Sequence, residues 1–219
     1  MFNLFGTWFN IGPLTVIVLL LLIAAVWQII KLAKSVRRKK DDIPWRILMV
    51  ALTSLILLPA AFFEIRLQIA NATMTGLVRQ ISGNYSAVAR CQRDMGDSLN
   101  FNTYIAHGLA YIDKGLVIID GTRCHNFMGW YLSDKAHADD NQTWSVGVLI
   151  HESVHLEGQS NEAITECETM ERYGRVAFEI MRAPRDEAVR MSDLYKTKLH
   201  ALTPKSYQMD CDAYWDSKK

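Results

Sequence analysis

Two long apolar runs near the N-terminus dominate the hydropathy pattern of this chain. Residues 11–30 and 47–63 contain no Asp, Glu, Lys or Arg. A helix needs about 20 such residues to cross roughly 30 Å of hydrocarbon, and the second run reaches that length if Trp45 and Arg46 form its interfacial end. The pattern predicts transmembrane helices over about residues 11–33 and 45–65, within a membrane anchor formed by residues 1–66.

Each run has an alternative interpretation. A cleaved signal peptide would need a positively charged segment before the first run, and residues 1–10 carry no charge. A buried core helix would suit the second run, because that run has only 17 residues and contains Pro59. The core helix therefore stays open as the alternative for residues 47–63.

Charge between the runs predicts the topology. Seven basic residues lie there: Lys31, Lys34, Arg37, Arg38, Lys39, Lys40 and Arg46. The positive-inside rule places this loop in the cytoplasm, where it also contacts lipid headgroups. We therefore expect a multi-pass protein of the cell membrane with both termini extracytoplasmic.

Residues 67–219 then form an extracytoplasmic domain of about 150 residues, which is large enough to bury its own core. These residues hold 16 of the basic and 20 of the acidic side chains, a formal net charge of −4. The domain has no basic patch that would indicate a nucleic-acid partner.

All four cysteines lie in this second domain: Cys91, Cys124, Cys167 and Cys211. An even number in an oxidising compartment predicts two disulfides, with three possible connectivities. Four buried free thiols are the alternative, because cysteine packs well as a small apolar side chain. A disulfide at Cys167 would pin the segment next to Glu166.

The periodicity of the second domain is mostly helical. Residues 67–93 look helical with an interruption near residues 82–84, and they could continue the second membrane helix outward. Residues 104–112 and 116–119 flank Asp113-Lys114-Gly115, which predicts a β-hairpin. Further helices are expected from the caps at 139–141 to Gly158, over 161–182 and over 186–202. The fold class is therefore mainly α with a small β-hairpin, of the α+β kind.

The most informative motif is His151-Glu152-Ser153-Val154-His155, inside the expected helix of residues 139–158. Residues four apart share a helix face, so the two imidazoles lie one turn apart beside a carboxylate. This is half of the zinc site found in zinc hydrolases, and Zn²⁺ is the expected cofactor. A hydrogen-bonded histidine pair without metal is the alternative. The apolar helix, the closing Gly158 and the acids that follow favour the metal site.

A catalytic zinc site needs a third protein ligand and an open position for water. Glu162 and Glu166 are the candidates, because a reversal at Gly158 would bring the first turn of the next helix to the imidazoles. Asn161 stands where a metzincin carries its third histidine, which argues against that class.

At this point the chain resembles the gluzincin class of zinc metallopeptidases, in which H-E-x-x-H is completed by a glutamate on a later helix. More narrowly, residues 162–166 are similar to the E-x-x-A-D segment of membrane-bound metalloproteases of the CaaX-protease and heat-shock type. The resemblance covers about residues 144–180. It implies a zincin-like fold, with Glu162 as zinc ligand and Glu166 as support for a histidine. Thr165 and Glu166 replace the usual Ala-Asp, and the gap after His155 is short, so Glu166 stays open as the alternative third ligand.

The expected chemistry is zinc-dependent peptide hydrolysis, with Glu152 as the catalytic general base. The candidates for a donor to the developing oxyanion are Tyr173, Tyr195, His125 and His200.

Two functions are compatible with this reading. The first is a membrane-anchored zinc metallopeptidase that hydrolyses protein or peptide substrates outside the cytoplasm. The second is a non-catalytic zincin-like membrane protein that serves as an interaction or assembly subunit of a larger membrane protein complex. The second is favoured by the small domain and by the lack of a strand other than 116–119 to align a peptide. Loss of Glu152 would distinguish the two.

Overall fold

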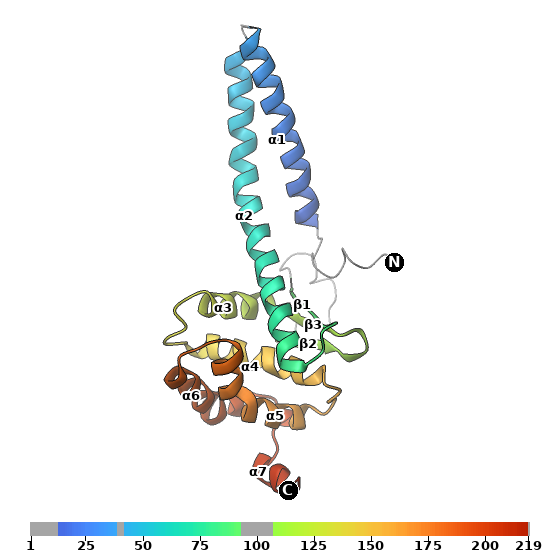
Figure 1. The fold of residues 1–219 in the computed structure, drawn as a ribbon, viewed down its shortest axis with the longest axis vertical. Coiled ribbons are helices and arrows are strands. Elements are labelled where there is room, and N and C mark those ends of the chain that lie inside the picture. Colours follow the sequence, from blue (N-terminus) through green and yellow to red (C-terminus); the bar gives the residue numbers. More distant parts are fainter. Residues whose placement is uncertain (1–12, 39–41, 93–106, 219) are drawn as a thin grey trace. The chain divides into compact units, whose positions relative to one another are not determined.

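A computed structural model describes residues 13–38, 42–92 and 107–218 (Figure 1). These residues are mainly helical, with one small three-stranded sheet. The chain divides into two compact units, residues 1–69 and residues 70–219.

The first unit contains two helices that are long and apolar enough to cross a membrane. Helix α1 spans Pro13–Arg37 and α2 spans Ile43–Ser82, and their most apolar parts have mean hydropathies of 2.6 and 2.1. Those parts are largely unburied, which is unlike the core helix of a soluble protein. Helix α2 passes through Pro59 and continues well beyond residue 65, so its C-terminal turns belong to the second unit.

Polar side chains in the first unit pair between these helices. The Thr15 hydroxyl donates to Glu64 Oε1 at 2.7 Å, and the Thr53 hydroxyl donates to Gln28 Oε1 at 3.1 Å. These hydrogen bonds give each polar side chain a partner, and a polar group without one would be costly in an apolar environment.

The sheet of the second unit has the order β1-β3-β2. Strand β1 (Val88–Cys91) runs parallel to β3 (Leu116–Ile119), and β2 (Gly108–Tyr111) runs antiparallel to β3. The predicted hairpin is confirmed for β2 and β3, while residues 104–106 lie outside the described residues. Two expectations are corrected. The interruption predicted near residues 82–84 is confirmed, since α2 ends at Ser82, but the residues after it form β1 and not helix. Residues 116–119 are the central strand, so that β2 forms an edge among the described strands.

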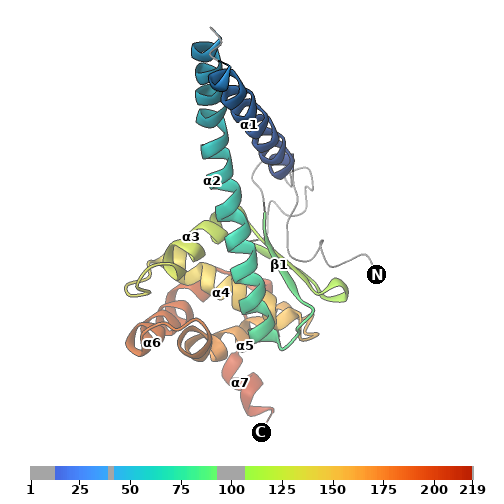
Figure 2. The same ribbon diagram turned by 45° about the horizontal axis from the view of Figure 1, so that its top comes forward.

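In the described part of the chain, five α-helices follow the N-terminal pair: α3 (Gly121–Tyr131), α4 (Asp140–His155), α5 (Glu162–Arg175), α6 (Arg185–Leu194) and α7 (Cys211–Asp216). Figures 1 and 2 show α4 between α3 and α5. The predicted cap of α4 is confirmed, because Asp139 and Gln142 form a capping box. Gly158 adopts φ 98° in the turn before α5. The sequence pattern did not predict α3 or α7.

The helices predicted over 161–182 and 186–202 are less regular than expected. Helix α5 continues into a π-helical turn at Val176–Ile180. Helix α6 continues through a second π-helical turn at Tyr195–Leu199 and a 3₁₀ turn at His200–Leu202. Tyr195, at the start of the second π-helical turn, continues the buried face that Ala188, Met191 and Ser192 form on α6.

Both expected disulfides are present. Cys91–Cys124 joins β1 to α3, and Cys167–Cys211 joins α5 to α7. The first lies in the core, where both sulfurs contact the Met74 sulfur. No free cysteine is left.

Replacing Cys91 and Cys124 together by Ser should lower the free energy of unfolding of the second unit by about 2–4 kcal/mol, because the open chain gains conformational entropy. Denaturant titration of the full chain in detergent, followed by tryptophan fluorescence, measures this loss. An unchanged unfolding midpoint would show that the disulfide does not hold β1 in place.

Candidate metal centre

Helix α4 carries the two histidines of the motif into the interior of the second unit. Every residue from Ser145 to His155 is buried. His151 and His155 are four residues apart, so their side chains leave the same face of α4, and they are only 7% and 9% exposed. A buried pair of imidazoles needs polar partners, which defines the rest of the site.

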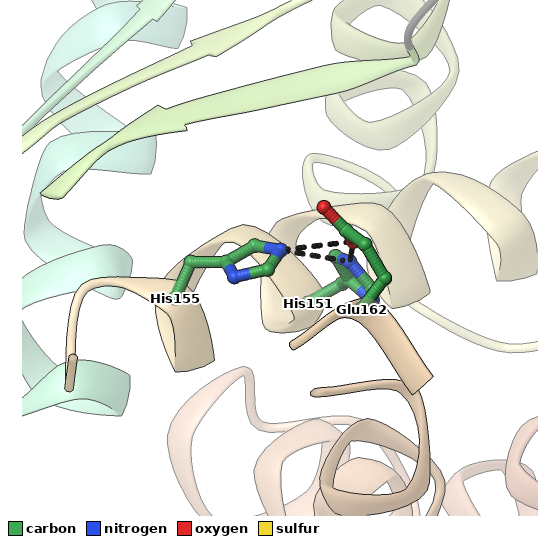
Figure 3. Close-up of side chains that lie close together, drawn as sticks. All are labelled: His151, His155 and Glu162. Carbon is green, nitrogen blue, oxygen red and sulfur yellow. Dashed lines mark hydrogen bonds and ion pairs between the residues drawn. The ribbon is translucent and has the colours of Figure 1, made fainter. Parts of the chain in front are cut away.

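Three ligand atoms converge on one point (Figure 3). His151 Nε2 and His155 Nε2 are 3.1 Å apart. Glu162 Oε2 lies 3.0 Å from the first and 3.1 Å from the second. Among the described residues, these three side chains form the one cluster of His, Cys, Asp and Glu close enough to hold a metal ion. We call them the metal triad.

The outer nitrogen of each imidazole is occupied. His151 Nδ1 lies 3.0 Å from Glu166 Oε2, and His155 Nδ1 lies 2.6 Å from the carbonyl oxygen of Gln159. Carboxylate and carbonyl oxygens only accept, so each Nδ1 carries the hydrogen. In the neutral imidazoles, the Nε2 lone pairs therefore face each other and Glu162, an arrangement that requires a proton or a cation between them.

The metal triad fits a divalent ion by its donors and spacing. Zinc bound at 2.0–2.1 Å in tetrahedral geometry separates its ligand atoms by about 3.4 Å, close to the observed triangle. Two nitrogens and one carboxylate oxygen are a ligand set of catalytic zinc sites, although imidazole and carboxylate also suit other metals. The Glu162 side chain is 41% exposed, so the site is open to solvent on that side.

The two candidate third ligands have different positions. Glu162, in the first turn of α5, reaches both Nε2 atoms. Glu166, one turn later, lies behind His151 and contacts its Nδ1. In this geometry Glu162 belongs to the metal triad, and Glu166 orients one of its histidines.

Glu166 connects the site to the end of the α6 segment. The Tyr195 hydroxyl donates to Glu166 Oε2 at 3.3 Å, and His200 Nδ1 lies 3.2 Å from Glu166 Oε1. Burial disfavours the ionised carboxylate, but hydrogen bonds from His151 and His200 outweigh this cost and lower the pKa of Glu166 to about 2. Glu166 therefore remains an anion at neutral pH.

The carboxylates also control the imidazoles in the metal-free protein. Burial disfavours protonated His151, but hydrogen bonds to Glu162 and Glu166 outweigh it and raise the pKa of His151 to about 9. Burial likewise opposes ionisation of Glu162, yet hydrogen bonds from both histidines lower its pKa below the usual range. The site thus holds a positive charge between two carboxylates, where a metal cation would replace the proton.

Glu152 lies against the edge strand β2. A Cβ atom at Gly108 would be 2.6 Å from Glu152 Oε1, so only glycine leaves room for the carboxylate there. Burial raises the pKa of Glu152 to about 7, although the nearby histidines and a hydrogen bond from the Ala110 backbone N–H oppose the shift. A carboxyl with this pKa can exchange a proton near neutrality.

The expected donor residues do not all reach this site. The Tyr173 hydroxyl donates to the Thr143 carbonyl, and His125 lies exposed on α3. Tyr195 and His200 contact Glu166, behind His151. Tyr207 was not among the predicted site residues, yet its ring stacks on His151 with centroids 5.4 Å apart and planes 18° apart. The available signal was Cys211, four residues later, whose disulfide draws this segment to α5.

No protein-family model, no curated protein and no solved structure matches the chain. The function is therefore inferred from the geometry of the described residues.

Tyr195, which donates to Glu166, is held by a close approach between α4 and the turn that follows α6. The Tyr195 ring lies against Gly147 on α4, and a Cβ atom there would be 2.1 Å from Tyr195 Cε2. Both residues are buried, so the ring cannot swing into solvent. Replacing Gly147 by Ala should cost about 1–3 kcal/mol of unfolding free energy through overpacking and should displace Tyr195 from Glu166.

Gly129→Ala on α3 is the matched control, because its nearest neighbour would be 3.9 Å away and alanine favours a helix. Denaturant titration of both variants measures the difference. Equal stability of Gly147→Ala and the parent would contradict the packing of Tyr195 described here.

Proposed function

We propose that this protein is a membrane-anchored zinc metallopeptidase with a zincin-like catalytic domain. The observation that carries the proposal is the convergence of His151 Nε2, His155 Nε2 and Glu162 Oε2 within 3.1 Å of one another. The buried Glu152 beside them provides the general base that such an enzyme needs.

In this proposal the metal triad binds the ion and Glu152 transfers the proton. His151, His155 and Glu162 would hold Zn²⁺, which when bound acidifies water and polarises a carbonyl. The Glu152 carboxylate takes a proton from the water that attacks the scissile carbonyl carbon. The same carboxyl then gives that proton to the nitrogen of the leaving amine. Its pKa of about 7 suits both transfers at neutral pH.

Strand β2 offers a place for an extended peptide. In the described part of the chain β2 is an edge strand of the sheet, and it packs against α4, the helix that carries His151 and His155. In the antiparallel pairing with β3, Gly108 and Ala110 turn their backbone groups away from β3, as the bond from Ala110 to Glu152 illustrates. A substrate added alongside β2 would bring its backbone past Glu152. This edge supports the peptidase over a purely non-catalytic assembly subunit.

Two features of the first unit support a placement in the membrane: its two apolar helices and the basic residues between them. Helices α1 and α2 would cross the cell membrane with the basic segment between them in the cytoplasm. The second unit and both termini then lie outside, where disulfides persist. Protein or peptide substrates would be those within reach of the membrane surface.

Replacing Glu152 by Gln should reduce peptide hydrolysis by at least about 100-fold, because the amide cannot accept the proton. The bound zinc should be unchanged, since Glu152 lies outside the metal triad. A quenched-fluorescent peptide library measures hydrolysis by the full chain in detergent, and elemental mass spectrometry measures zinc in the same sample.

Glu171→Gln serves as the control, because Glu171 is an exposed carboxylate on α5. It should hydrolyse the library at the parent rate. Zinc-loaded parent protein that cleaves nothing, or a Glu152→Gln variant as active as the parent, would reject the peptidase.

A further inference from the structure

The chain returns to α5 after α6. Residues 200–211, which we call the C-terminal strap, contact α5 at three places. His200 Nδ1 lies 3.2 Å from Glu166 Oε1, the Tyr207 segment packs on α5 with its hydroxyl beside Glu162, and Cys211 is bonded to Cys167. The first two contacts reach the carboxylates that belong to, or support, the metal triad.

Tyr207 occupies the central position in the strap. Its ring covers one face of His151, and its hydroxyl faces Glu162, so one side chain touches two members of the metal triad. A tyrosine hydroxyl carries its hydrogen at neutral pH and can donate it to a carboxylate. A donor in this position fixes the orientation of the Glu162 carboxylate.

Within the strap few other interactions reach α5, and just beyond it the Tyr214 hydroxyl donates to Glu168 Oε1 at 3.2 Å. Gln208 Nε2 donates to the Thr203 carbonyl at 2.9 Å, but this bond lies within the strap. The apolar side chains Leu202 and Met209 are 62% and 38% exposed, so the strap gains little from apolar burial. Cys167, in contrast, is buried in α5 directly after Glu166, and its bond to Cys211 is the covalent tie between the strap and the site helix.

We propose that the Cys167–Cys211 disulfide locks the C-terminal strap over the metal triad, with Tyr207 as a positioning residue, so that oxidation completes the metal site. Formation of the Sγ–Sγ bond releases two protons and two electrons to a disulfide-bearing oxidant, which becomes a dithiol. In the reduced protein the strap is free to leave α5, and Tyr207 leaves with it. This inference rests on the proposed metal site, but it does not require peptide hydrolysis.

The first test removes the lock. Replacing Cys167 and Cys211 together by Ser should increase hydrogen exchange in residues 200–211 and leave α4 protected. The same variant should bind Zn²⁺ about 10-fold more weakly in a chelator competition, which is typical for loss of a group that orients a ligand. Reduction of the parent should reproduce the faster exchange in residues 200–211.

The second test distinguishes the effect of the Tyr207 hydroxyl from the effect of releasing the strap. Tyr207→Phe removes only the hydroxyl that faces Glu162, and we expect Zn²⁺ affinity to fall about 10-fold with strap exchange unchanged. Tyr214→Phe is the matched control, because its hydroxyl donates to Glu168, which is outside the metal triad. It should bind Zn²⁺ as the parent does.

The outcomes distinguish the two proposals. Parent-like Zn²⁺ affinity in both the double Ser variant and Tyr207→Phe would overturn the strap proposal and leave the metal site standing. Parent-like exchange of residues 200–211 in the double Ser variant would likewise show that the disulfide is not the lock. A parent that binds no Zn²⁺ would overturn both. Zinc binding that responds to the strap, without any hydrolysis, would support the strap and reject the peptidase.

Discussion

The hydrogen bonds at the outer nitrogens of His151 and His155 are the interactions on which the site depends. Because Glu166 and the Gln159 carbonyl hold the two Nδ1 positions, both Nε2 lone pairs point at the same space as Glu162. Without those acceptors, either ring could flip or change tautomer, and the three donors would not converge. The rest of the second unit can be understood as the structure that keeps these two acceptors in place.

That support is spread over several elements. Glu166 is positioned by Tyr195 and His200, which follow α6, and Tyr195 fits only because Gly147 leaves space on α4. Glu166, which orients His151, is thus oriented in turn by packing from a neighbouring helix. Such layered support is what holds a reactive geometry rigidly.

Burying two imidazoles and several carboxylates is costly for a unit of about 150 residues. The charges compensate one another, since His151 pairs with Glu162 and Glu166 in the metal-free state. The two disulfides supply further stability where the core is small, one within the core and one at the C-terminal strap. A bound cation would remove the remaining conflict between the converging lone pairs.

The local parts of this arrangement were predictable and the distant parts were not. The motif on α4, its capping box and the β2–β3 hairpin are encoded by residues close in sequence, where helical period and turn chemistry are informative. Strand β1 was missed because four residues that follow a long helix pair with a strand far along the chain. Tyr207 was missed for the same reason. It lies far from Glu162 in sequence, and a disulfide of unknown connectivity was the only indication of where it folds.

The most direct test of the metal site is the zinc content of the purified full chain, measured by elemental mass spectrometry for the parent and for His155→Ala, Glu162→Ala and Glu166→Ala. The account predicts one zinc per chain in the parent, loss of zinc in the first two variants, and weakened but detectable binding in Glu166→Ala. A parent without metal, or a Glu162→Ala variant that keeps its zinc while Glu166→Ala loses it, would contradict the three-ligand site described here.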